Sequence, residues 1–167
     1  MGIVPFDFSP KGKNSLQALA YHFKTWNKKL LVHNTFAKRE DILFASDNLS
    51  DLFWVMCPAA NQYIENRLPP IYEFMSLNQD IAIGTDSLAS NNSLSILKEI
   101  KIISENFPSV PLEMLVKWST YYGAKALGMD NKLGSFEPGK KPGINLIDMI
   151  DFREMKLTEG SSVTVLV

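Results

Sequence analysis

Two side chains with the chemistry of an active site follow short apolar runs in this sequence. His33 comes directly after Leu30-Leu31-Val32, and Asp86 follows Ile81-Ala82-Ile83-Gly84-Thr85. An apolar run that ends in polar groups suits a buried parallel strand with its functional end at the carboxyl side. An imidazole and a carboxylate there can transfer protons or bind a metal ion. Taken singly, His33 also suits a hydrogen-bonded histidine at a strand end, and Asp86 a turn aspartate.

Alternating strands and helices are predicted to position these groups. We expect buried strands within residues 29–35, 51–58 and 80–87 and helices over residues 15–28, 38–45, 70–77, 93–107 and 111–127, with a loop over residues 61–70. Such alternation predicts an α/β fold with a parallel sheet and right-handed crossovers. Glycines and prolines break the chain after Gly128, so a small β appendage is expected from short apolar stretches at 144–150 and 162–167. The predicted division is 1–130 and 131–167.

The composition excludes several classes of protein. The 167 residues are 46% hydrophobic and 21% charged with a formal net charge of −1, which gives no basic face for a nucleic acid. The single cysteine, Cys57, rules out an internal disulfide and favours a reducing, cytoplasmic setting. No apolar run approaches the roughly 18 residues that span a bilayer, and no secretory leader is evident, so neither a membrane nor secretion is expected.

Four stretches, taken in order, resemble a known enzyme family. They read LLVHNT at 30–35, CPAAN at 57–61, GTDSLASN at 84–91 and NKLGSFEPGKKPGINLID at 131–148, and YYGAKALG at 121–128 precedes the last of them. This order and spacing resemble the last third of the amidohydrolase superfamily, in the branch of cytosine, guanine, adenosylhomocysteine and aminodeoxyfutalosine deaminases and triazine chlorohydrolases. The resemblance implies the last strand-helix units of a (β/α)8, TIM-type barrel, followed by a C-terminal β segment of a composite β-sandwich. A complete barrel takes about 250 residues.

The resemblance also implies a reaction and a set of site residues. In the family, water bound to zinc or iron hydrolyses a carbon-nitrogen or carbon-halogen bond, because the ion lowers the pKa of that water. By this resemblance Asp86 is a metal ligand and the base that takes the proton of the water, and His33 holds the attacking water or substrate and is a second candidate metal ligand. Ser87 and Asn91 are expected to orient Asp86 and its loop through hydrogen bonds.

Three more residues are candidates for substrate binding. Asn61, Tyr63 and Glu65 lie on the loop expected after the second strand, although Glu65 beside Arg67 equally suits a surface ion pair. Alanines occupy positions 59 and 60, where the family often has an arginine and a serine. This departure removes a donor for anionic or carbonyl groups and leaves the usual heterocycle preference in doubt.

The remaining motifs of the family are missing from this sequence. The family takes metal ligands from a His-x-His pair and from a further histidine, with a glutamate three residues after the latter, whereas this chain contains only His22 and His33. His22 lies within the first predicted helix without an acidic residue three positions later, so it does not replace either set. Two protein ligands do not make a catalytic zinc site, which normally needs three.

Three hypotheses follow for the function. The leading one is the carboxy-terminal part of a metal-dependent deaminase of a small amino-heterocycle, with zinc or iron in the full-length protein and with this chain alone metal-free and inactive. The second is a non-enzymatic half-barrel that pairs with itself as a homo-oligomer or with an amino-terminal partner. The third is a hydrolase whose reduced metal site is completed across a dimer.

Other conspicuous residues have structural interpretations. Cys57 is expected to be a buried core thiol. Trp26, Trp54 and Trp118 are expected in the core or an interface, because no basic groove accompanies them. The Gly139-Lys140-Lys141 run is expected to be a solvated turn, since it lacks the strand and helix that flank a phosphate loop.

Overall fold

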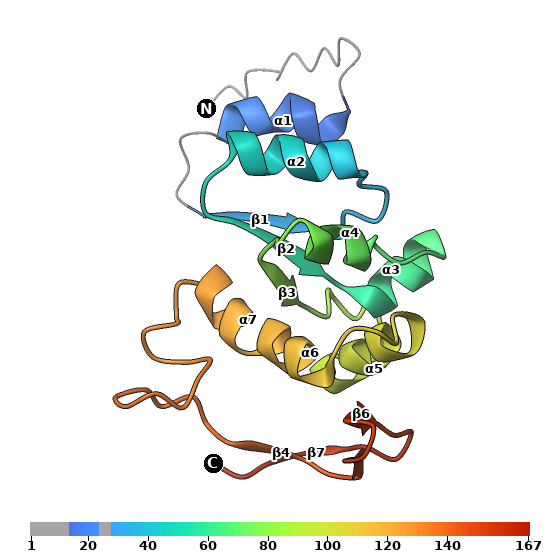
Figure 1. Ribbon diagram of the computed structural model, residues 1–167, viewed down its shortest axis with the longest axis vertical. Coiled ribbons are helices and arrows are strands. Elements are labelled where there is room, and N and C mark those ends of the chain that lie inside the picture. The colour runs from blue at the N-terminus through green and yellow to red at the C-terminus, as the bar shows by residue number, and fades with distance from the viewer. Residues whose placement is uncertain (1–13, 24–27) are drawn as a thin grey trace.

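A computed structural model describes residues 14–23 and 28–167, with only the backbone described at residues 19 and 21–23. Residues 1–13, Trp26 and the His22 side chain therefore lie outside the described residues. Helices and strands alternate along most of the chain (Figure 1). The elements are α1 Ser15–Phe23, β1 Lys29–Val32, α2 Arg39–Asn48, β2 Leu52–Met56, α3 Pro58–Glu65, α4 Ile71–Ser76, β3 Ile81–Ile83, α5 Ile96–Asn106, α6 Leu112–Ser119, α7 Tyr121–Ala126, β4 Asn145–Ile147, β5 Ile150–Asp151, β6 Lys156–Leu157 and β7 Val163–Val165.

The first three strands form one parallel sheet in the order β1-β2-β3. Leu31 pairs with Trp54, and Trp54 pairs in turn with Ile81. The expected α/β class and parallel sheet are confirmed. The strands end at Val32, Met56 and Ile83, so each is shorter than its predicted range.

Alternate strand residues bury one face of the sheet in the main core. Trp54, Met56, Ile81 and Ile83 pack there against apolar side chains from α2, α4, α5 and α6. The indole of Trp54 is fully buried, lies 4.7 Å from the ring of Phe74 and donates a hydrogen bond from Nε1 to the Gln79 side chain at 3.0 Å. This core holds the strands in register and so fixes where their carboxyl ends lie.

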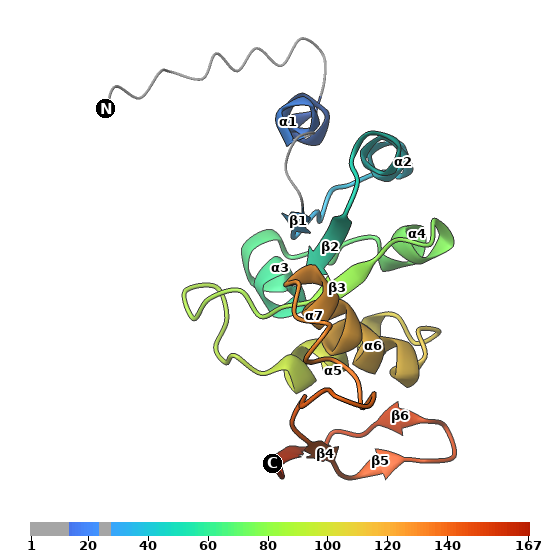
Figure 2. The ribbon, with the colours of Figure 1, turned by 90° about the vertical axis from the view of Figure 1, so that its left-hand side faces the viewer.

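The opposite face of the sheet is only partly covered by the described residues. Phe53 and Ala82 form a small cluster with Ala126 of α7, whereas Leu30 and Val32 of the edge strand β1 remain 42% and 46% exposed. In both views α1 and α2 lie beyond β1, and α5 to α7 lie beyond β3 (Figures 1 and 2).

Two helical predictions need correction. Asn61–Glu65, predicted as loop, belong to helix α3, because Pro58 occupies its first turn and starts the helix as well as stopping β2. The single helix predicted over 111–127 is two helices divided at Thr120, where ψ is −79°. The hydroxyls of Ser119 and Thr120 bond back to carbonyls of the preceding turn, a contact that bends helices.

The carboxy-terminal segment contains short antiparallel ladders. Strand β4 pairs with β7, and β5 pairs with β6. Figure 2 shows them separated from the parallel sheet by α5 to α7, and Lys101 Nζ on α5 donates to the Glu159 carbonyl at 2.7 Å. The predicted β character of this segment is confirmed, while a domain boundary at residue 130 stays a prediction.

None of the helices in the described part of the chain has the length and apolar character needed to cross a membrane.

Truncation of Phe74 should strongly lower the stability of the protein, because its ring is fully buried against Trp54. Phe74→Ala should lower the free energy of unfolding by about 3–5 kcal/mol, because it removes a ring and leaves a cavity. Urea unfolding measures this change. The matched control is Phe152→Ala, since that ring is 78% exposed and its loss should cost within about 0.5 kcal/mol. Equal losses in the two variants would contradict this description of the core.

Candidate active site at the carboxyl ends of the strands

His33 and Asp86 lie close together at the carboxyl ends of the parallel strands. His33 follows β1 and its N–H donates to the Val55 carbonyl at 3.0 Å, while the N–H of Gly84, two residues before Asp86, donates to the Met56 carbonyl at 2.8 Å. Their side chains approach to 4.0 Å between His33 Nε2 and Asp86 Oδ2. About a third of each side chain is exposed, 36% for His33 and 33% for Asp86. The two groups can therefore act on the same bound molecule.

The backbone is strained at both positions. His33, Asn34 and Asp86 have φ values of 70°, 52° and 56°, in the left-handed region. Such conformations cost about 1–3 kcal/mol each and recur at functional sites. The Asn34 side chain offsets part of this cost, because its Nδ2 donates to the Leu31 carbonyl at 2.8 Å. The turn after β1 aims His33 toward Asp86 in place of continuing the strand.

Hydrogen bonds within the loop after β3 orient Asp86. The Ser90 hydroxyl donates to Asp86 Oδ2 at 2.5 Å. Ser87, predicted for this role, instead accepts from the Ala89 N–H through its hydroxyl at 3.3 Å. Asn91, the other residue expected to orient this loop, donates from Nδ2 to the Thr85 carbonyl at 2.9 Å. Ser90 was missed because nothing in the sequence distinguishes it from Ser87.

A buried carboxylate fastens this loop to helix α3. Glu99 of α5 is fully buried, although glutamate is almost never fully buried unless it is paired. One of its carboxylate oxygens accepts from Asn91 Nδ2 at 2.7 Å and the other from the Ala59 N–H at 2.8 Å. Burial raises the pKa of Glu99, and the two hydrogen bonds oppose that shift. Glu99 therefore joins the loops that follow β2 and β3.

Asn61 lies beneath His33 and does not face solvent. Only 1% of it is exposed, so the predicted direct contact with a substrate is not favoured by its position. Its Nδ2 donates to the Thr35 hydroxyl at 2.6 Å and lies 3.4 Å from both His33 Nδ1 and Glu65 Oε2. Thr35, another residue that sequence reasoning missed, follows the same strand as His33.

Tyr63 and Glu65 differ in their surroundings. Tyr63 is 75% exposed and lines a hollow of about 350 Å³ beside the Asp86 loop, together with residues that include Leu88 and Lys98. Glu65 is half-buried near Asn61. The alternative surface pair is not formed among the described residues, because Arg67 lies over the ring of Phe36, 5.6 Å from its centroid.

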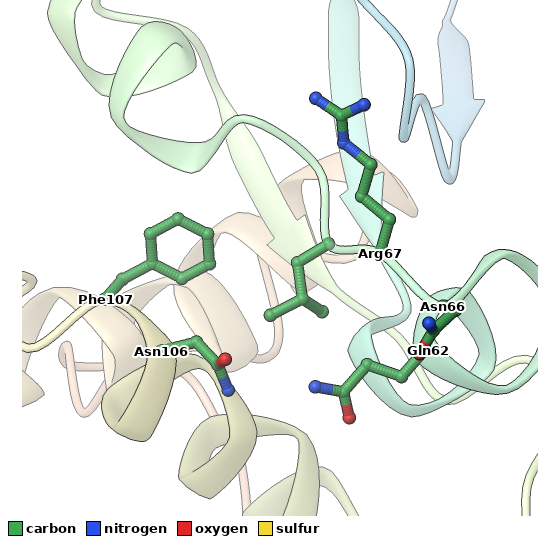
Figure 3. Close-up of a pocket in the computed structure, with 6 residues that line it drawn as sticks. Gln62, Asn66, Arg67, Asn106 and Phe107 are labelled. Atoms are coloured by element: carbon green, nitrogen blue, oxygen red, sulfur yellow. The ribbon is translucent and has the colours of Figure 1, made fainter.

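A second hollow lies away from these residues. It has a volume of about 480 Å³ and lies where α3 and α5 end. Figure 3 shows the amides of Gln62 and Asn106 pointing toward one another across it. The remaining lining residues are Asn66, Arg67, Leu68 and Phe107. It contains no carboxylate or imidazole, so it offers no group for hydrolytic chemistry.

The described residues do not form a complete metal site. Within residues 14–23 and 28–167, leaving aside the side chains that are not described, no cluster of three His, Cys, Asp or Glu residues could hold a metal ion. Cys57 is no substitute, because it is buried as predicted and its pKa is raised to about 11, chiefly by that burial. The donors on hand are thus the imidazole of His33 and the carboxylate of Asp86.

Comparison with known proteins finds relatives among deaminases. A model of the amidohydrolase family matches residues 12–165. A 5-methylthioadenosine/S-adenosylhomocysteine deaminase from Teredinibacter turnerae is 31% identical over 147 residues, which cover 84% of this chain and 33% of the relative. An adenosine deaminase from Helicobacter pylori is 28% identical, over 70% of this chain and 29% of the relative. The chain therefore spans about a third of the length of these relatives.

Solved structures agree with this likeness. The aminofutalosine deaminase of Helicobacter pylori, in complex with methylthio-coformycin, superposes with a TM-score of 0.66 at 26% identity and covers 77% of this chain and 31% of its own. A zinc-bound adenosine deaminase from Xanthomonas campestris gives a TM-score of 0.62 at 25% identity, over 75% of this chain and 30% of its own. A triazine hydrolase variant, at 21% identity, shares the fold with a TM-score of 0.71 over 92% of this chain and 38% of its own.

The buried Glu99 predicts a pH dependence of stability. Because its folded pKa is raised above the unfolded value of 4.5, the folded state binds more protons than the unfolded state between the two pKa values. The contribution of Glu99 to the free energy of unfolding should therefore fall as the pH rises above 4.5. Urea unfolding across a pH series should show this decline in the wild type and a flatter profile in Glu99→Gln.

The control for this experiment is Glu113→Gln, since the Glu113 side chain is exposed on α6. It should leave the slope of stability against pH unchanged. Parallel profiles for the wild type and Glu99→Gln would show that the Glu99 carboxyl does not experience the burial described.

Proposed function

Because the chain belongs to the amidohydrolase family, we propose that it supplies His33 and Asp86 to a site that deaminates an amino-heterocycle with water. The observation that carries the proposal is the approach of these two side chains to 4.0 Å at the carboxyl ends of β1 and β3. Catalytic groups of TIM-type barrels lie at this end of the strands. In this proposal β1, β2 and β3 are barrel strands, and the full-length protein provides the others.

A divalent ion, zinc or iron, would supply a water of lowered pKa to such a site when bound. A catalytic zinc site takes three protein ligands and keeps one position open. Asp86 and His33 do not meet that requirement by themselves. The missing donors therefore have to come from outside the described residues.

The chain's own residues have distinct roles in the proposed hydrolysis. The Asp86 carboxylate accepts a proton from water as the water oxygen bonds to the carbon that carries the amino group. It then returns that proton to the amino nitrogen, the carbon-nitrogen bond breaks, and ammonia leaves an oxo-heterocycle behind. His33 hydrogen-bonds to the attacking oxygen or to the heterocycle. Ser90 holds the Asp86 carboxylate in place through its hydroxyl.

The proposed substrate class is an adenine-type nucleoside. Relatives over most of this chain are deaminases of adenosine and 5-methylthioadenosine/S-adenosylhomocysteine. The exposed Tyr63 and Leu88, in the hollow beside the Asp86 loop, offer an aromatic and an aliphatic surface for a heterocycle or its substituent. Alanine stands at position 59 of that hollow in place of the arginine common in the family, and Lys98 is the basic side chain among the described residues that line it.

The test is ammonia release from adenosine and 5′-methylthioadenosine with Zn²⁺ present. A chimera in which this chain replaces the matched segment of the Teredinibacter turnerae deaminase should be active. Asp86→Asn in the chimera should lower kcat/KM by about 10²–10⁴-fold, the usual contribution of a general base. The 167-residue chain alone should release ammonia only at the background rate.

The matched control is Asp47→Asn, an exposed position on α2, which should leave kcat/KM unchanged. A folded chimera that lacks activity, or one whose activity survives Asp86→Asn, would contradict the proposed function.

A second candidate function is self-association as a half-barrel. The edge strand β1 leaves Leu30 and Val32 42% and 46% exposed on the face of the sheet that α7 covers only in part. An open strand edge with apolar side chains favours pairing with another chain.

This candidate predicts that the purified chain sediments as a dimer at micromolar concentration. Leu30→Glu should shift it to the monomer, because a charge would be placed in the contact. Leu43→Glu is the matched control, since Leu43 is also 42% exposed but lies on helix α2. A wild-type chain that sediments as a monomer would contradict self-association.

A further inference from the structure

The burial of the Asn61 side chain lowers the stability of the protein, and packing alone does not explain why a polar residue lies there. It is 1% exposed, and its Oδ1 has no hydrogen-bond partner within the described part of the chain. A buried carbonyl oxygen without a donor is destabilising, and an apolar residue of similar size would avoid the penalty. The polar contacts of this side chain are made by its Nδ2, which faces His33, Thr35 and Glu65.

The position of that nitrogen is well fixed. The Asn61 backbone N–H donates to the Cys57 carbonyl at 2.9 Å in the first turn of α3. Its Nδ2 donates to the Thr35 hydroxyl at 2.6 Å, which ties the helix to the segment after β1. The contact with His33 Nδ1, at 3.4 Å, is longer and weaker. Thr35 therefore anchors the amide, which directs its other N–H toward His33 Nδ1 and Glu65 Oε2, each 3.4 Å from Asn61 Nδ2.

The two nitrogens of His33 face groups of opposite character. Nδ1 faces the Asn61 amide N–H, which is a donor, while Nε2 lies 4.0 Å from the Asp86 carboxylate, which only accepts. A neutral imidazole has one N–H and one lone pair, and its neighbours decide which nitrogen carries the proton. Both neighbours favour the lone pair on Nδ1 and the proton on Nε2.

We propose that Asn61 is a positioning residue that keeps the proton of neutral His33 on Nε2. His33 then offers an N–H, and not a lone pair, to whatever is bound beside Asp86. For the proposed deamination, on which this consequence rests, His33 becomes a hydrogen-bond donor to the attacking oxygen or the heterocycle. A protonated Nε2 has no lone pair for a metal ion, so the inference argues against His33 as a metal ligand through that atom.

The experiment is nuclear magnetic resonance of the imidazoles, by long-range ¹H–¹⁵N correlation at alkaline pH in the 167-residue chain. The chain contains only His22 and His33, so a His22→Gln variant assigns both sets of signals. Wild-type His33 should show the pattern of the Nε2–H tautomer. Asn61→Leu should lower the ratio of Nε2–H to Nδ1–H by about 2- to 10-fold, the equivalent of one weak hydrogen bond.

Asn61→Asp should reverse the tautomer preference of His33. A carboxylate at that position accepts a hydrogen bond from Nδ1–H and should make the Nδ1–H tautomer predominant. Gln62→Leu, one residue further along α3 and exposed, is the matched control and should leave the His33 pattern unchanged. Wild-type His33 in the Nδ1–H form, or one tautomer pattern shared by the wild type and the Asn61 variants, would overturn the inference.

No metal or substrate is needed for these spectra, so the result is independent of the deamination assay. An inactive chimera, together with the predicted His33 tautomers, would contradict the proposed function and support the Asn61 inference. An active chimera in which the Asn61 variants leave the His33 tautomers unchanged would support the proposed function and overturn the Asn61 inference.

Discussion

The central strand β2 is the constraint on which the candidate site depends. Its last carbonyls accept hydrogen bonds from both sides, that of Val55 from the His33 N–H and that of Met56 from the Gly84 N–H. Parallel strands bring their carboxyl ends to one edge, so groups distant in sequence meet there. The burial of Trp54 and Met56 keeps β2 in register between its neighbours. Asp86 and His33 face each other because β2 lies between their strands.

Much of this architecture could be predicted from local sequence. Apolar runs identified the three parallel strands, of which the first and third are followed by polar residues and the second ends at Pro58. Helical periodicity identified most helices, because burial on one face is a local pattern. The same pattern placed His33 and Asp86 at strand ends. Where two local signals competed, the sequence was ambiguous: Pro58 was recognised as the end of β2 but not as the start of α3, and Thr120 interrupts a pattern that otherwise reads as one helix.

The supporting residues could not be predicted in the same way. Glu99 lies between Lys98 and Ile100 on a helix, and only the packing of α5 against α3 reveals that its carboxylate is buried. Ser90 and Ser87 are equivalent by type, and the turn after Asp86 decides which hydroxyl reaches the carboxylate. Asn61 was expected to face a substrate, but the helical path of α3 turns it beneath His33. These roles are set by tertiary geometry, which has no signature in residue spacing.

The left-handed backbone at His33, Asn34 and Asp86 has a consequence for how such a sequence can evolve. Aspartate, asparagine and glycine tolerate this conformation better than β-branched residues do, whatever the chemistry of the site. The substitutions tolerated at position 86 are therefore limited to a few residue types, even if catalysis were lost. An aspartate at this position suits the geometry of the turn whether or not it is catalytic, so a lineage that lost hydrolysis could keep the outline of an active site.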